Sequence, residues 1–165
     1  YNNVGAEALY GLTRGALAVA LTAGVHATNL DAGFYAAKAG LRLRWMSGAF
    51  SLASSPTVLV ALTHRDDTPK NVDQLFVPVL ASYKPAKPLT LSLGSGLKGP
   101  LDGLGNAWEV PLGFIGTVAL SPKLAVGTSL VFGKLLGGAD DPPAPAAPAT
   151  GQRYRAFQLW LTWNR

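Results

Sequence analysis

The last twelve residues constrain the fold most, because large apolar side chains recur there with a period of two. Between Tyr154 and Arg165, the large apolar residues on one face are Phe157, Leu159, Leu161 and Trp163. Successive side chains of a β-strand point to opposite faces, whereas a helix would need a period near 3.6. The stretch therefore predicts a strand with one oily face, which either an earlier sheet or lipid must cover.

The same alternation recurs along most of the chain. Five segments are regular, and these are residues 15–27, 34–45, 89–97, 108–120 and 124–132. In each, the large residues share one face and the other face carries mainly Ala, Gly, Ser, Thr or a charge. Segments 52–64 and 74–83 are less regular, and the second contains Pro78. Proline removes a ladder donor, so we expect a β-bulge at Pro78 and another at Pro111.

The alternation predicts about eight strands. Eight strands follow from residue 15 onward, and residues 3–11 resemble a ninth. Residues 1–13 are therefore an extra strand or a tail. An odd number is unusual for single-chain bacterial barrels. Three explanations stay open: a tail, a tenth strand upstream, or an unusual closure; a total of nine or ten strands is the alternative to eight.

Breaks between the strands alternate in length. The short ones are residues 12–14, 46–49, 84–88 and 121–123, and the long ones are 28–33, 65–73, 98–106 and 136–152. The last break holds the Pro- and Ala-rich run 140–150, which favours extended, solvated backbone. Residues 136–152 are therefore predicted to form an external loop.

Composition decides what covers the oily faces. Apolar residues make up 48% of the chain and charged residues 14%, whereas a typical soluble domain has roughly 25% charged residues. No apolar run approaches the ~20 residues of a membrane helix. Small residues on the second face would fill a narrow barrel, with the bulky face toward lipid. We therefore predict an all-β fold, a single-domain antiparallel up-and-down transmembrane β-barrel over residues 1–165.

The terminal run Tyr154-Arg-Ala-Phe-Gln-Leu-Trp-Leu-Thr-Trp163 resembles the C-terminal strand signal of bacterial outer-membrane β-barrel proteins, although Arg165 stands where that signal has an aromatic residue. The stretch Tyr10-Gly-Leu-Thr-Arg-Gly15 looks like the turn segments of that class. Aromatic residues at strand ends resemble its interfacial girdles, and these are Trp45, Tyr83, Trp108 and Trp163. The resemblance implies an integral protein of a Gram-negative outer membrane. Its implied partners are membrane lipid and the barrel-insertion machinery.

Five charges fall on the interior-facing positions: Glu7, Lys38, Arg42, Arg44 and Glu109. Charges inside a narrow barrel are costly unless they are paired or wet. We expect Glu7 and Glu109 to neutralise some of the bases, through Arg42 or Arg44 and Lys38. The result is either a salt-bridged plug, which is favoured, or an anion-attracting pore.

Arg153 and Arg155 follow the longest break and would sit at the external rim. The guanidinium fork suits phosphate, so these residues are candidates for binding lipid phosphate. Ordinary solvated rim charges are the equal alternative. The remaining basic residues are scattered, which gives no indication of nucleic-acid binding.

Catalytic and cofactor motifs are weak. Residues 94–99 match a dinucleotide fingerprint, but the Gly- and Pro-rich residues that follow predict a turn and not a helix, so no cofactor is predicted. His26 and His64 lie at the long-break ends of their strands near acidic residues. Neither belongs to a recognisable catalytic spacing. We therefore predict no catalytic or metal site, and a lipid-modifying enzyme is the minor alternative.

The favoured function is a structural or surface-exposed outer-membrane barrel, or a narrow, porin-like passive channel for transport. A soluble lipocalin-like barrel carrying an apolar ligand is the alternative from another class. The odd strand number leaves a further possibility, that a partner chain completes the barrel.

Overall fold

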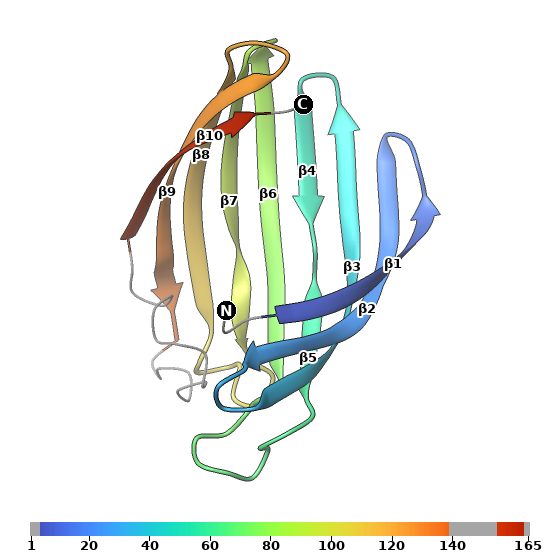
Figure 1. Cartoon of the computed structure of the whole chain (residues 1–165), viewed down its shortest axis with the longest axis vertical. Helices are drawn as coiled ribbons and strands as arrows, with labels where there is room; N and C mark the ends of the chain where they lie inside the picture. The colour runs from blue at the N-terminus through green and yellow to red at the C-terminus, as the bar shows by residue number, and fades with distance from the viewer. Residues whose placement is uncertain (1–3, 139–154, 164–165) are drawn as a thin grey trace.

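The computed structural model describes residues 4–138 and 155–163, with residue 155 described by its backbone alone. This part of the chain forms ten strands and no helix (Figure 1). The strands are β1 (Val4–Thr13), β2 (Leu17–Asn29), β3 (Phe34–Ser47), β4 (Phe50–Ser54), β5 (Thr57–Ala61), β6 (Gln74–Ala86), β7 (Leu89–Pro100), β8 (Glu109–Ala119), β9 (Leu124–Gly137) and β10 (Arg155–Trp163). The predicted all-β class is confirmed. Among the described residues, no helix has the length and apolarity needed to span a bilayer.

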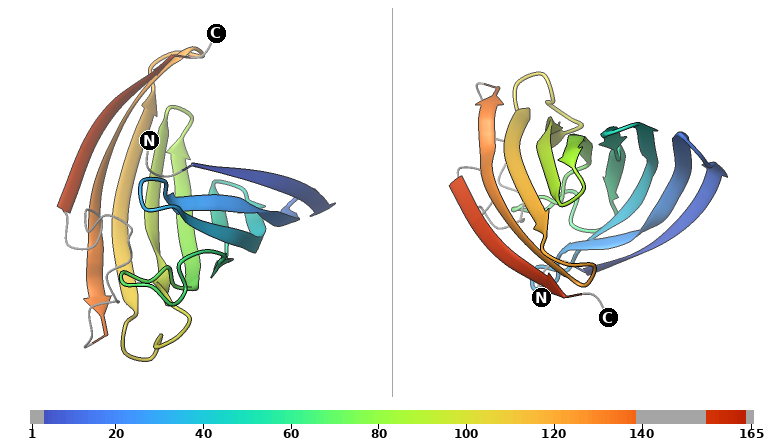
Figure 2. Two further views of the ribbon diagram at one scale, coloured as in Figure 1. Left: turned by 60° about the horizontal axis from the view of Figure 1, so that its bottom comes forward. Right: turned by 90° about the horizontal axis from the view of Figure 1, so that it is seen from above.

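All ten strands belong to one antiparallel sheet. Its order is β1-β2-β3-β4-β6-β7-β8-β9-β10, and β5 pairs with β3 and β6 beyond the end of β4. The sheet therefore has nine strand positions, with β4 and β5 sharing one of them. Viewed from above, the sheet curls into a trough whose two edges are β1 and β10 (Figure 2). Neighbouring strands along the chain are neighbours in the sheet, as an up-and-down arrangement requires.

The predicted number of about eight strands is wrong, for two reasons. Residues 4–13 are not a tail, because β1 pairs with β2 from Val4 opposite Ala27 to Thr13 opposite Val19. The segment predicted over residues 52–64 divides into β4 and β5. The break falls at Ser55 and Pro56, where proline cannot donate to the ladder.

The two interior prolines behave differently. The register between β8 and β9 shifts between Val110 and Leu112, so the irregularity predicted at Pro111 is present. The bulge predicted at Pro78 is wrong, because Pro78 pairs in continuous register with Gly96. Instead, the neighbouring strand is interrupted opposite it, since Ser54 pairs with Val79 and pairing resumes only at Thr57. Pro78 leaves β6 without a backbone N–H donor at the point where the neighbouring strand position is interrupted between β4 and β5.

Most of the large apolar side chains lie on the outward face, and many of them are exposed, whereas a few, such as Leu59, Leu80 and Ile115, face inward. Leu91 is 46% exposed and Leu161 is 68% exposed, whereas inward-facing Thr22 and Ser129 are buried. Leu41 and Val126, also on the outward face, are half-buried, and Gln158 at the edge strand is exposed on the inward side. The buried apolar residues are few and mostly small: Ala20, Ala27, Phe34, Ala36, Leu59, Ala61 and Ala107. The predicted separation of large and small side chains therefore holds for most of the sheet, and the sheet has no large apolar core in its described part.

Short connections gather at one end of the sheet and longer ones at the other. The short-turn end holds the β1–β2, β3–β4, β6–β7 and β8–β9 connections. The long-loop end holds residues 62–73 and 101–108. The β2–β3 connection at this end is shorter than predicted, because it spans only residues 30–33. It is closed by a hydrogen bond from Gly33 N to Leu30 O of 3.1 Å, with Gly33 at φ 66°.

Candidate functional site on the concave face

An ion-pair cluster around Glu7 lies on the concave face toward the long-loop end. The register places Glu7 opposite Gly24, and Gly24 opposite Lys38, so the three form one row across β1, β2 and β3. Gly24 has no side chain to separate its neighbours, and the Glu7 carboxylate contacts Lys38 Nζ across it. Arg42 Nη2 donates to Glu7 Oε1 at 2.5 Å. The pairing predicted for Glu7 is therefore present.

A second ion pair joins β7 and β8. Lys98 lies opposite Glu109 in the register, and Lys98 Nζ is 2.9 Å from Glu109 Oε2. The Glu109 side chain is 2% exposed, and its Oε1 has no hydrogen-bond partner among the described residues. Glu109 was expected to neutralise one of Lys38, Arg42 and Arg44, and this expectation is wrong because its partner is Lys98. The sequence pattern predicts that Lys98 lies in a loop, but β7 continues to Pro100 and carries Lys98 inward.

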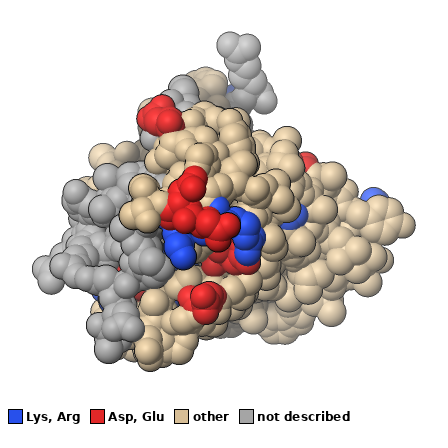
Figure 3. Space-filling model, turned by 90° about the horizontal axis from the view of Figure 1, so that it is seen from below, with Lys and Arg blue, Asp and Glu red and all other residues tan. Residues whose placement is uncertain are grey.

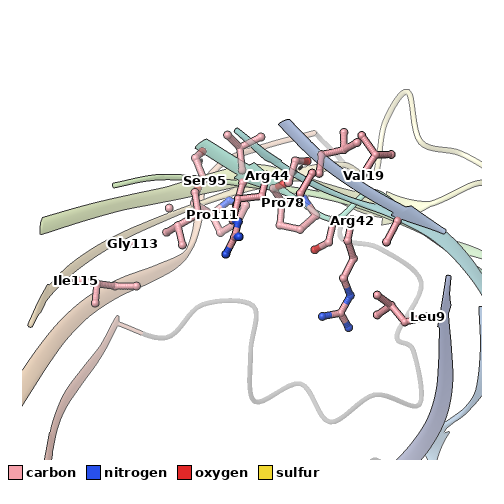
Figure 4. Close-up of a pocket in the computed structure, with 18 of the residues that line it drawn as sticks. Leu9, Val19, Arg42, Arg44, Pro78, Ser95, Pro111, Gly113 and Ile115 are labelled. Carbon is pink, nitrogen blue, oxygen red and sulfur yellow. Dashed lines mark hydrogen bonds between the residues drawn. The ribbon is translucent and has the colours of Figure 1, made fainter. Parts of the chain in front are cut away.

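Arg44 stands apart from both pairs. In the part of the chain that the structure describes, its side chain makes no ion pair and no hydrogen bond. Arg42 and Arg44 both extend from β3 to the concave side of the sheet (Figure 4). There they border a groove of about 790 Å³ lined largely by small and aliphatic residues, among them Ala18, Ala20, Ala53, Gly94, Gly113 and Val131. Among the described residues, the interior charges thus comprise the neutral pair of Lys98 and Glu109, the Glu7 cluster with one excess positive charge, and the unpaired cation of Arg44.

The β5–β6 loop is held by a charged network outside the strands. Arg65 binds Asp73 through two hydrogen bonds of 2.9 and 3.1 Å, and Asp73 Oδ1 accepts the Ala61 N–H at 2.8 Å. Burial raises the pKa of Asp73, but the hydrogen bonds from Arg65 and Ala61 outweigh it and hold the pKa below its usual value. Viewed from the long-loop end, charged side chains of both signs gather on one part of the surface (Figure 3). The hydrogen bonds of the Asp73 carboxylate to Arg65 and to the Ala61 N–H hold the β5–β6 loop against the end of β5.

The two histidines lie in different surroundings. His64 Nδ1 lies 2.5 Å from Asp67 Oδ2, and its ring stacks on Phe34 with centroids 5.2 Å apart. His26 is half-buried beside Lys38 and Thr57. No serine or threonine hydroxyl hydrogen-bonds to either imidazole within residues 4–138 and 155–163. In the same residues, no group of three His, Asp or Glu side chains could hold a metal ion.

Residues 94–99, which match the dinucleotide fingerprint, lie within β7. They pair with β6 on one side, and partly with β8 on the other, so they form no phosphate loop. Arg153 and the run 140–150 lie outside the described residues. Arg155 begins β10, but its side chain also lies outside the description. Binding of lipid phosphate by these two arginines stays a prediction.

No family model matches the chain, and neither a curated protein nor a solved structure was found to be similar to it.

Proposed function

We propose that this chain is an integral outer-membrane β-barrel protein with a structural or surface role. The observation that carries the proposal is the exposed apolar face of the sheet. Large exposed side chains occur on every strand position, for example Leu21, Tyr35, Leu93, Phe114, Leu130 and Leu159. Soluble monomers rarely expose a continuous apolar patch beyond a few hundred Å². Hydrocarbon is the environment in which such a face is stable.

The alternative of a soluble carrier for an apolar ligand is less well supported. A lipocalin-like barrel keeps its large apolar residues inside and polar ones outside. Here Leu91 and Leu93 face outward, while Ser92 between them and Gly94 after them face inward. This burial pattern is the reverse of what such a carrier needs.

The direction of the edge strands bears on how the barrel closes. Strand direction alternates over nine positions, so β1 and β10 run the same way. Direct pairing of these edges would be parallel, whereas an antiparallel barrel needs an even number of positions. We propose that one added strand, supplied either by chain upstream of residue 1 or by a partner chain, runs antiparallel to both edges. It would also cover the unpaired backbone groups, which are costly in lipid.

A narrow passive channel is the second candidate, and the groove beside Arg44 favours it. Ion pairs occupy the long-loop half of the concave face, and small residues line the half beyond it. The first half corresponds to a plug and the second to an open vestibule. Such a barrel would carry little current unless the Glu7 cluster is wet.

The test is to fold the full chain into neutral-lipid vesicles and wash them with alkaline carbonate. The proposal predicts that the chain stays with the vesicles, with unheated mobility on a gel different from heated mobility. Release of folded, vesicle-free protein by carbonate would contradict it. Planar-bilayer conductance then separates the two candidates, because the structural role predicts no steps and the channel predicts small, uniform ones.

A further inference from the structure

We propose that the groove beside Arg44 binds an organic anion, with Arg44 as the anchor for the charge and the groove lining as the surface for an apolar body. The inference goes beyond the proposed function, because a barrel with a structural role needs no ligand. It is carried by an unpaired guanidinium inside a groove of about 790 Å³ that has no carboxylate in its described lining.

The row of residues around Arg44 explains why the cation is unpaired. Across the sheet, Arg44 lies in register with Ala18 on β2 and Ala53 on β4. The same row continues through Leu80, Gly94, Gly113, Val131 and Ala156. None of these side chains can accept a hydrogen bond from a guanidinium. The row therefore provides space and apolar surface but no acceptor for the five N–H donors of Arg44, which is an exposed residue.

The contrast with Arg42 identifies Arg44 as the anchor. Arg42, two residues earlier on the same face, already donates to Glu7, which also neutralises Lys38. The Glu7 carboxylate is thus shared by the two cations Lys38 and Arg42, whereas Arg44 has no carboxylate partner among the described residues. An incoming anion would find its strongest partner at Arg44 and a weaker one at Arg42.

The lining determines the rest of the ligand. The volume lies in the range of roughly 300–1,000 Å³ that is typical of small-molecule sites. Leu9, Val131 and Ile115 contribute aliphatic surface, and Gly94 and Gly113 leave room against the sheet. A bare inorganic ion would leave this surface wet. An anion joined to an aromatic or aliphatic body would use both the cation and the lining.

The experiment measures binding of 1-naphthyl phosphate to the full chain folded in neutral-detergent micelles, by fluorescence, with empty micelles subtracted. The comparison ligands are inorganic phosphate and the neutral 2-naphthalenemethanol. The unmodified chain should bind naphthyl phosphate at least about tenfold more tightly than either, because only this ligand carries both groups. Equal competition by inorganic phosphate, or equal binding of the neutral alcohol, would overturn the proposal.

Variants locate the site. Arg44→Gln should weaken naphthyl phosphate binding about tenfold or more, and Arg44→Lys should lose less because it keeps the charge without the fork. Arg42→Gln should have a smaller effect than Arg44→Gln, and Lys123→Gln in the β8–β9 turn is the control without effect. Each variant is first checked for folding by its unheated gel mobility. Unchanged binding in folded Arg44→Gln would refute the site, and because no current or membrane insertion is measured, that result would leave the proposed function standing.

Discussion

The two faces of β7 and β8 differ in the size of their side chains, although the same two strands carry both. On the outward face, Leu93 lies opposite Phe114, and both are nearly half exposed. On the inward face, Gly94, one residue after Leu93, lies opposite Gly113, one residue before Phe114. A closely curved sheet has little volume on its concave side, so small residues fit there and large ones point outward. In this part of the sheet, the size of a side chain and the curvature of the sheet, and not hydrophobicity alone, agree with the side that the residue occupies.

The largest expected effect comes from placing a charge on the outward face near the middle of a strand. Leu93→Arg should destabilise the chain folded in a bilayer by roughly 2–4 kcal/mol, because the guanidinium would enter hydrocarbon. Thr90→Arg, on the inward face of the same strand, should cost under about 1 kcal/mol. Urea titration in vesicles measures both. Equal losses of unfolding free energy in Leu93→Arg and Thr90→Arg would contradict different environments on the two faces.

A smaller effect is expected from the buried ion pair on the inward face. Lys98→Met leaves the Glu109 carboxylate, 2% exposed, without its cation and should cost about 2 kcal/mol. The double variant Lys98→Met with Glu109→Leu removes the unpaired charge and should recover most of the loss. A double variant as unstable as the single one would show that the ion pair is not what matters at this position.

The Glu7 cluster should contribute less, because it is wetter. The exposed fractions of its side chains are 17% for Glu7, 27% for Lys38 and 56% for Arg42. Glu7→Gln should therefore lower the free energy of unfolding by about 1 kcal/mol. In planar bilayers, the same variant should raise any anion current by leaving two cations uncompensated. Unchanged stability and unchanged current in Glu7→Gln would show that the Glu7 cluster contributes neither to folding nor to the charge inside the barrel.

The smallest effect concerns pH and the β5–β6 loop. Because the folded-state pKa of Asp73 is lowered, its contribution is present above the unfolded value of about 3.8. That contribution is lost as pH falls through the lower folded-state pKa. Protection of the Ala61 amide, whose N–H donates to Asp73, should fall as pH drops below about 3.8, when the exchange rate is compared with that of an unstructured chain at the same pH. In Asp73→Asn, exchange at Ala61 should be fast already at neutral pH, and slow exchange there would contradict the role of the carboxylate.

The sequence predicts much of the fold, because alternation of large and small residues is a local property. It predicts nearly every strand and assigns Glu7, Lys38 and Arg42 to one face. It does not predict that Lys98 pairs with Glu109, since the glycines and proline of residues 94–100 are typical of a turn, and only pairing with β6 and β8 keeps them extended. The isolation of Arg44 depends on the register of eight strands, which alternation alone does not determine.

The most direct test of the account is the environment of successive side chains along β7. The chain contains no cysteine, so single cysteines at residues 89–95 can each carry a nitroxide label in bilayer-folded protein. The account predicts a period of two, with collisions with oxygen highest at 91 and 93, and collisions with a water-soluble nickel chelate highest at 90, 92 and 94. An alternation of opposite phase, or the same water accessibility at 91 and 93 as at 92, would contradict a lipid-facing outer surface.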